Sequence, residues 1–126
     1  MELTVDALEY LHDADLHGVN VDSTTPNRSV SFAATFHDDC SASYLNGRSI
    51  QVVLDDVILL RAEVHGATTA PEKIDHCRLS VSAQTQKSLA EWIEMSGRKP
   101  ACSLTLVTHS GSSWEIMCES IAVHFV

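Results

Sequence analysis

The chain has 126 residues, enough for one domain with its own core and too few for two domains of ordinary size. Its eight Lys and Arg residues are outnumbered by seventeen Asp and Glu residues, which gives a formal net charge of −9. Nucleic acids and anionic membranes attract proteins with a surplus of cations, so this charge argues against both as partners. We expect a single domain over residues 1–126 whose charged partner, if it has one, is basic.

The N-terminus has neither the basic start nor the long apolar run of a secretory signal, and no apolar stretch approaches the roughly 20 residues that cross a bilayer. We therefore expect a cytoplasmic protein. The acidic charge is concentrated in residues 1–27, where no Lys or Arg precedes Arg28. The acidic residues of that segment are Glu2, Asp6, Glu9, Asp13, Asp15 and Asp22.

The cysteines are too far apart in sequence for a Cys-x-x-Cys redox or zinc motif. In a reducing cytosol they are expected to be free thiols that act as small buried apolar residues, with two disulfides as the alternative. They are Cys40, Cys77, Cys102 and Cys118.

Apolar residues spaced by three, at Val5, Leu8 and Leu11, predict a short helix that begins near Thr4. A strand is predicted to follow from Asp15. Its apolar positions change parity at Gly18, which indicates a bulge.

A turn at Thr24–Asn27 is predicted to precede the clearest strand of the chain, in which alternate residues from Val30 to Phe36 are apolar. Asn46-Gly47 indicates a tight hairpin because both central positions of a type I′ turn need positive φ. Asp55-Asp56 is interpreted as a turn between two further strands.

In the second half, alternation around Cys77 predicts a strand, and the capping pattern Ser88-Leu89-Ala90-Glu91 predicts a helix that ends at Gly97. The chain is expected to end in a hairpin.

A three-residue turn at Ser110–Ser112 would place Leu106 opposite Ile116 in that last hairpin. Cys102 and Cys118 would then be diagonal neighbours about 7 to 8 Å apart at Cα, too far for a disulfide.

These elements predict a mainly β fold, an antiparallel β-sandwich or open barrel of about seven or eight strands with one or two short helices. A sheet with a helix packed on one face is the alternative.

Histidines and carboxylates cluster where the first helix meets the first strand, and both are ligands of divalent transition metals. Asp15 and His17 share one side of a strand, and His37 from the paired strand is expected at the same end of the hairpin as Asp15. His12, Asp15, His17 and His37 are therefore the candidate metal ligands. The alternative is that Asp13 caps a turn and His12 only packs against the sheet.

Catalytic motifs are missing from the sequence. It contains no Gly-x-Ser-x-Gly elbow and no Gly-rich phosphate loop, and its cysteines lie in or beside strand-like runs where a thiol is inert. His76 and Cys77 cannot act as a dyad on a strand, because adjacent side chains face opposite sides. We therefore do not expect an enzyme, and no cofactor is required unless the histidine cluster holds a metal.

The order Leu11-His12-Asp13-Ala14-Asp15-Leu16, then Val19-Asn20-Val21-Asp22, and later Val52-Val53-Leu54-Asp55-Asp56-Val57 resembles small uncharacterised bacterial proteins. Some of these are grouped with immunity proteins of polymorphic toxin systems. The resemblance covers roughly the first half of the chain. It implies a protein that neutralises a toxin by binding it and supplies no catalytic residue.

Three hypotheses follow from the sequence. The first is a non-enzymatic binding protein of the immunity type, whose acidic surface would meet a basic toxin. The second is a small metal- or ligand-binding β-domain that uses the histidine and aspartate cluster. The third is a structural subunit that forms a homodimer through an exposed sheet edge or face.

Overall fold

The computed structural model describes residues 2–3, 5–23, 28–65, 72–80 and 102–126. These residues form seven β-strands and two short 3₁₀ helices. In chain order the elements are β1 (Glu2–Leu3), η1 (Val5–Tyr10), β2 (Asp15–Asp22), β3 (Ser29–Thr35), η2 (Ser43–Leu45), β4 (Ser49–Glu63), β5 (Glu72–Ser80), β6 (Cys102–Thr108) and β7 (Ser113–Phe125).

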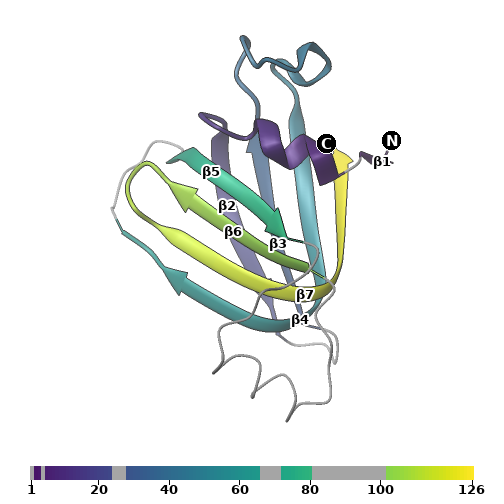
Figure 1. The fold of residues 1–126 in the computed structure, drawn as a ribbon, viewed down its shortest axis with the longest axis vertical. Helices are drawn as coiled ribbons and strands as arrows, with labels where there is room; N and C mark the ends of the chain where they lie inside the picture. The colour runs from purple at the N-terminus through teal and green to yellow at the C-terminus, as the bar shows by residue number, and fades with distance from the viewer. Residues whose placement is uncertain (1, 4, 24–27, 66–71, 81–101) are drawn as a thin grey trace.

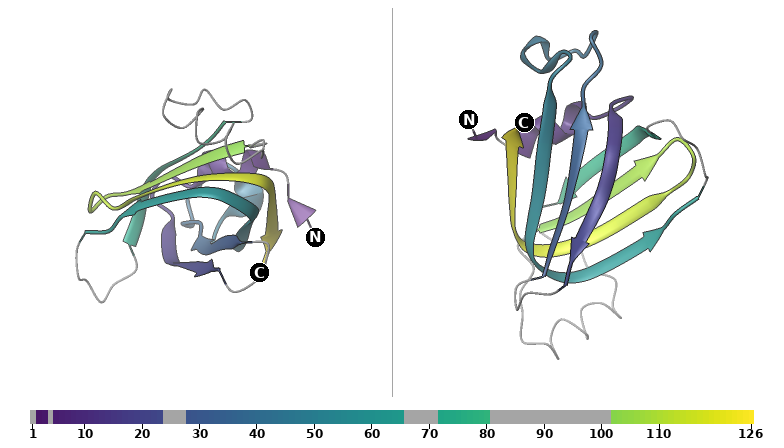
Figure 2. Two further views of the ribbon diagram at one scale, coloured as in Figure 1. Left: turned by 90° about the horizontal axis from the view of Figure 1, so that it is seen from below. Right: turned by 180° about the vertical axis from the view of Figure 1, so that it is seen from behind.

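All pairings between these strands are antiparallel, and the strand order is β1-β7-β4-β3-β2-β5-β6. Because β6 also pairs with β7, six of the strands close into a barrel, with β1 added beside β7. Figures 1 and 2 show these strands wrapping around one interior. The predicted mainly β, antiparallel fold is confirmed, and the pairing of β6 with β7 makes it a closed barrel.

β7 closes the barrel because its first half has two partners. Ile116 lies opposite Leu104 of β6 and opposite Leu60 of β4. Beyond Cys118 the pairing with β6 ends, and the strand bends away while it stays paired with β4 (Figure 1). One continuous strand therefore links β4 to β6 in its first half and β4 to β1 in its second.

The seam between β2 and β5 is the shortest of the barrel. In the described part of the chain its register contains two pairs, Asp15 with Lys73 and Leu16 with Glu72. Two further backbone hydrogen bonds extend it, from Asp13 N–H to the Ile74 carbonyl at 2.8 Å and from Ile74 N–H to the Ala14 carbonyl at 2.9 Å. The short loop that follows η1 thus helps to hold β5 in place.

Every second side chain along β3 points into the barrel and helps to fill its interior. Val30, Phe32 and Ala34 of β3 are each at most 1 % exposed, and the residues between them are partly exposed. η1 packs against β5 and β7 and contributes Leu8, which is 2 % exposed. The helix predicted from Thr4 to Leu11 is therefore present over Val5–Tyr10, as a 3₁₀ helix.

The predicted bulge in the first strand is also present, since the ladder of β2 with β3 shifts register between Leu16 and Val19. Gly18 lies inside the shift and has a φ of 132°, a value that L side chains rarely adopt.

Two turn predictions are wrong. Gly47 has a φ of 66° but Asn46 has −54°, so Asn46-Gly47 is not a type I′ turn, which needs positive φ at both positions. It belongs instead to the longer β3–β4 connection that contains η2.

Asp55-Asp56 does not separate two strands either, because β4 runs on through it. Asp56 has a φ of 54°, and the bulge lies just beyond it, where the ladder with β7 shifts register between Val57 and Leu59.

The register of the last hairpin differs from the prediction by two residues. Leu106 lies opposite Trp114, and Cys102 lies directly opposite Cys118. The cause is a turn that starts one residue earlier than expected, because Thr108 N–H bonds the Ser112 carbonyl at 2.9 Å and leaves three residues at the tip.

Two other predicted elements lie outside the described residues, namely the turn at 24–27 and the helix near Ser88 to Gly97. Within the described residues, no helix has the length and apolar character to span a membrane.

Shortening Ile116 tests the closure of the barrel. Ile116 is fully buried between β4 and β6, so Ile116→Ala should lower the free energy of unfolding by about 2–5 kcal/mol and Ile116→Val by about 0.5–1.5 kcal/mol. The control is Val21→Ala, at a side chain 56 % exposed, with an expected change within about 0.5 kcal/mol. Urea unfolding followed by circular dichroism measures all three. Equal losses for Ile116→Ala and Val21→Ala would contradict the observed packing.

Candidate metal centre

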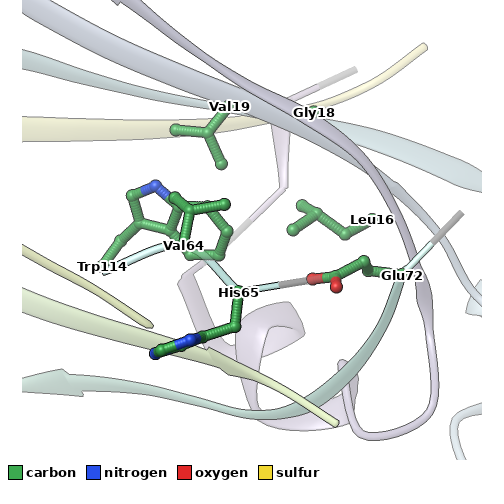
Figure 3. Close-up of a pocket in the computed structure, with 7 residues that line it drawn as sticks. All are labelled: Leu16, Gly18, Val19, Val64, His65, Glu72 and Trp114. Atoms are coloured by element: carbon green, nitrogen blue, oxygen red, sulfur yellow. The ribbon is translucent and has the colours of Figure 1, made fainter. Parts of the chain in front are cut away.

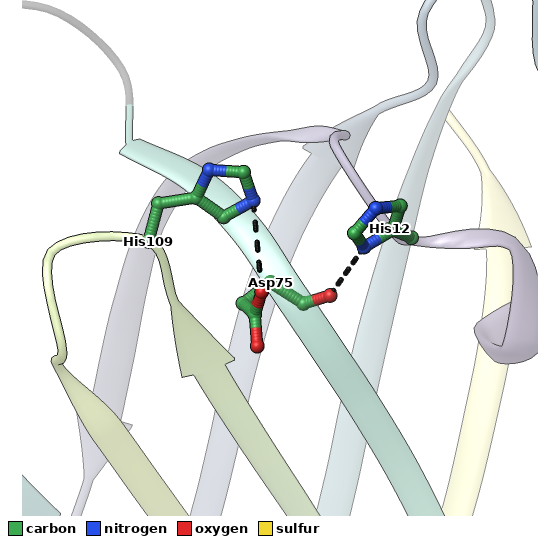
Figure 4. A group of neighbouring side chains, drawn as sticks. All are labelled: His12, Asp75 and His109. Atoms are coloured by element: carbon green, nitrogen blue, oxygen red, sulfur yellow. Dashed lines mark hydrogen bonds and ion pairs between the residues drawn. The ribbon is translucent and has the colours of Figure 1, made fainter.

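Three side chains from distant parts of the chain meet on the surface beside the β2–β5 seam (Figure 4). His12 comes from the loop after η1, Asp75 from β5 and His109 from the β6–β7 turn. One ligand atom from each lies within 4.8 Å of the other two. Among the residues that the structure describes, this is the one group of three or more His, Cys, Asp or Glu side chains whose ligand atoms lie that close together.

Backbone hydrogen bonds place these three residues. The stretch of β5 around Asp75 is held on one side by the Asp13 and Ala14 bonds to Ile74, and on the other by His109 N–H, which donates to the Lys73 carbonyl at 2.9 Å. Asp13 itself has a φ of 65°, a conformation that Asp adopts more readily than most residues. The chain therefore turns sharply at Asp13 and presents His12 toward β5.

A β-bulge sets the direction of Asp75. The ladder of β5 with β6 shifts register between Ile74 and His76, so Asp75 is the extra residue. Ile74 is fully buried, whereas Asp75 and His76 are both partly exposed and contact each other through His76 Nδ1 and Asp75 Oδ2 at 2.8 Å. His76 therefore orients the Asp75 carboxylate without belonging to the group itself.

Asp13 adds a second carboxylate at the same place. Its Oδ1 lies 3.1 Å from His109 Nε2, and its Oδ2 lies 3.4 Å from His12 Nε2. His12 Nδ1–H donates to the Asp75 carbonyl oxygen at 2.6 Å, which fixes the tautomer of this ring and leaves Nε2 as the available nitrogen. Two imidazoles and two carboxylates are thus gathered at one point.

The electrostatics of the group favour a bound cation. The hydrogen bond from His76 holds the pKa of Asp75 below its ordinary value, so this carboxylate is ionised at neutral pH. The pKa of His12 is raised, first by its bond to the Asp75 carbonyl and then by the charge of Asp13. A raised pKa favours the protonated ring, so a metal ion that binds His12 Nε2 would have to displace a proton, and its binding should weaken as the pH falls.

The donor set fits zinc or a similar divalent transition metal. Bonds of about 2.0–2.2 Å from zinc to nitrogen and oxygen place tetrahedral ligand atoms about 3.4 Å apart, so ligand atoms that lie within 4.8 Å of one another would have to approach by at most about 1.4 Å. The His12, Asp75 and His109 side chains are 46 % to 67 % exposed and have room to make that movement.

The four candidates from the sequence do not all lie in this group. His12 does. Asp15 Oδ1 pairs with Lys73 Nζ at 2.6 Å, and His17 Nε2 contacts Thr35 Oγ1 at 2.6 Å. His37 Nδ1 contacts the Asp39 carboxylate, and Asp15 lies opposite Thr35 in the β2–β3 register. Asp15, His17 and His37 thus each have a partner outside the group.

Sequence reasoning missed Asp75 and His109 as ligands. Asp75 lies 63 residues from His12, and no ligand spacing connects them. The one local signal was the adjacency of Asp75 and His76 in a predicted strand, where a bulge was not foreseen.

A separate pocket of about 210 Å³ includes Leu16 and Glu72, which pair with each other in the β2–β5 seam (Figure 3). Its ionisable groups are already engaged, because Ser110 Oγ donates to the Glu72 carboxylate and His65 Nε2 contacts Glu63 Oε1 at 3.0 Å. Most of its wall is apolar and suits a small apolar group. The lining residues are Leu16, Gly18, Val19, Val64, His65, Glu72 and Trp114.

Fold and site together define a small closed antiparallel β-barrel with a histidine and carboxylate centre beside its shortest seam. Comparisons with protein-family models, curated proteins and solved structures find no match. The resemblance of the N-terminal half to immunity proteins therefore stays a prediction.

Substitutions at Asp13 separate its backbone role from its charge. Asp13→Val places a β-branched residue at positive φ and should lower the free energy of unfolding by about 1–2 kcal/mol. Asp13→Asn tolerates that φ and should change it by less than about 0.5 kcal/mol, since the carboxylate is half exposed. Thermal unfolding in the presence of a chelator measures both. Equal losses would show that the carboxylate, rather than the backbone conformation, holds the loop.

Proposed function

We propose that this protein is a metal-binding β-barrel domain that holds one divalent transition metal ion through His12, Asp75 and His109. The observation that carries the proposal is the convergence of their ligand atoms within 4.8 Å from three separate segments. Asp13, which already contacts both imidazoles, is the available fourth ligand.

Details of the local geometry support this proposal over an ordinary network of surface ion pairs. The hydrogen bond on His12 Nδ1 is of the kind that orients metal-ligating histidines, and His76 restrains the Asp75 carboxylate in the same manner. The bulge at Asp75 interrupts the β5–β6 ladder and turns this side chain outward.

The ligand types select the metal. Magnesium and calcium prefer sites made entirely of oxygen, whereas two imidazole nitrogens with carboxylate oxygens suit zinc and its neighbours. If His12, Asp75 and His109 are the protein ligands, a fourth position remains for Asp13, a water molecule or a group from a partner. We expect zinc to bind more tightly than magnesium.

A bound ion would act as a clamp in this barrel. It would connect the loop after η1, strand β5 and the β6–β7 turn, and so reinforce the seam that has two register pairs. The expected consequence is a domain whose stability depends on metal.

Binding of a basic protein, as expected of an immunity-type protein, is the second candidate, and the net charge of −9 favours it. The two proposals are compatible, since a metal-clamped barrel can carry a partner surface. Recovery of a toxin-like partner in a pull-down from the native host would support the second candidate, and recovery of no protein partner would count against it.

Calorimetric titration with zinc tests the site directly, using chain without a histidine tag. Wild type should bind one ion, and His109→Ala or Asp75→Asn should weaken the affinity by at least about 10–100-fold because each removes a ligand. His37→Ala is the matched control and should bind as wild type does, since this ring contacts Asp39 instead. Loss of binding in His37→Ala with no effect of His109→Ala would overturn this assignment and restore the cluster expected from the sequence.

Cobalt substitution tests whether the cysteines bind the metal ion. Cobalt held by nitrogen and oxygen ligands lacks the strong thiolate charge-transfer absorption that cysteine ligands give. We expect the spectrum without that band, and its appearance would move the site to a cysteine.

Thermal unfolding with and without zinc tests the clamp. At a free zinc concentration of 100 times Kd, wild type should gain about 2.7 kcal/mol of stability and a Tm higher by several degrees. His109→Ala should show no such gain, and neither should wild type with excess chelator. An equal rise in Tm for wild type and His109→Ala would show that zinc acts at another place.

A further inference from the structure

Cys102 and Cys118 face each other across the β6–β7 hairpin. They form a direct pair in the register, and their Sγ atoms are 3.2 Å apart. Both are free thiols, 4 % and 0 % exposed. The hairpin holds them at its open end, away from the turn that carries His109.

This register removes the geometric objection to a disulfide between them. Directly opposite residues of an antiparallel pair have Cα atoms about 4.5–5.5 Å apart, inside the range of about 4.4–6.8 Å that disulfides span. The diagonal placement expected from the sequence would have put them beyond that range. Small side-chain rotations bring the two sulfur atoms from contact to bonding distance.

The other two thiols have different surroundings. Cys40 Sγ–H points to the Tyr10 carbonyl at 4.0 Å, and Cys77 lies opposite Leu106 in the β5–β6 register. Burial raises the pKa of Cys77 to about 12. The structure thus distinguishes one facing pair from two thiols without a facing thiol among the described residues.

We infer that Cys102 and Cys118 form a reversible cross-strand disulfide when the chain meets a low-molecular-weight disulfide such as oxidised glutathione. The thiolate of one cysteine attacks that disulfide, which gives a mixed disulfide and releases one glutathione thiolate. The second cysteine, deprotonated, then attacks the protein sulfur of the mixed disulfide and releases the second thiolate. The two protein thiols are oxidised, and one glutathione disulfide is reduced to two glutathione molecules.

Burial determines when the reaction occurs. The pKa of Cys118 is raised, first by burial and then by the hydrogen bond and the charge of Cys102. Few Cys118 thiolates therefore exist in the closed barrel. Oxidation therefore takes place before the hairpin closes during folding, or when β6 and β7 separate locally. Once formed, the bond is shielded from reductants in the same way.

The disulfide would strengthen the β6–β7 pairing, which is the pairing that closes the barrel. It would join β6 to β7 beside Val57, where β7 is also paired with β4. The closed ring includes the whole hairpin from Cys102 to Cys118, so the cross-link restricts the unfolded chain and stabilises the pairing that makes the barrel.

Refolding the reduced chain in mixtures of reduced and oxidised glutathione tests the inference. After acid quenching, free thiols are alkylated in denaturant and the linked peptides are identified by mass spectrometry. We expect one linkage, between Cys102 and Cys118, with Cys40 and Cys77 alkylated. Complete alkylation of Cys102 and Cys118 across the series, or linkage of either to Cys40 or Cys77, would overturn it.

A stability comparison on the same chain provides an independent readout. The oxidised wild type should melt on the order of 10 °C above the reduced form, and Cys102→Ser should abolish that difference. Cys40→Ser is the matched control and should keep it. A chelator in all samples separates this effect from the proposed metal site. No rise in Tm for a chain shown to be linked would contradict the role assigned to the bond.

Discussion

The pairing of β7 with both β4 and β6 is the constraint on which the rest of the structure depends. An open sheet of these strands would leave one side of β6 and part of β7 without hydrogen-bond partners, whereas the β6–β7 ladder satisfies both. The same ladder orients Ile116 and Cys118 into the interior, where both are fully buried. Closure therefore creates the core as well as the barrel.

The candidate metal centre depends on that closure. His109 reaches Asp75 because the β6–β7 turn lies beside β5. Two register pairs hold β5 against β2, and two hydrogen bonds hold it against the loop after η1. The centre thus forms where the barrel has the fewest strand-to-strand bonds. A cation there would add links that the ladder lacks. The facing cysteines lie at the other end of the same hairpin, so a metal ion and a disulfide would restrain it at separate places.

Local patterns predicted the elements whose cause is local. The strand from Val30 to Phe36 followed from strict alternation, and the bulge at Gly18 from a change of parity. Asp55-Asp56 was misinterpreted because two consecutive aspartates favour turns in general, whereas here the pairing of β4 with β7 continues through them. Of the three residues in the candidate metal centre, the sequence analysis had singled out His12, because the cluster around it is local.

The sequence by itself determined the acidic charge, the antiparallel β class and the approximate positions of most strands, because these depend on composition and on the order of apolar and polar residues along short segments. Only the tertiary structure decided that β6 returns to β7, that Cys102 faces Cys118, and that Asp75 and His109 join His12. Each of these depends on register between strands far apart in the chain. A shift of one or two residues leaves the local pattern almost unchanged and moves every cross-strand neighbour.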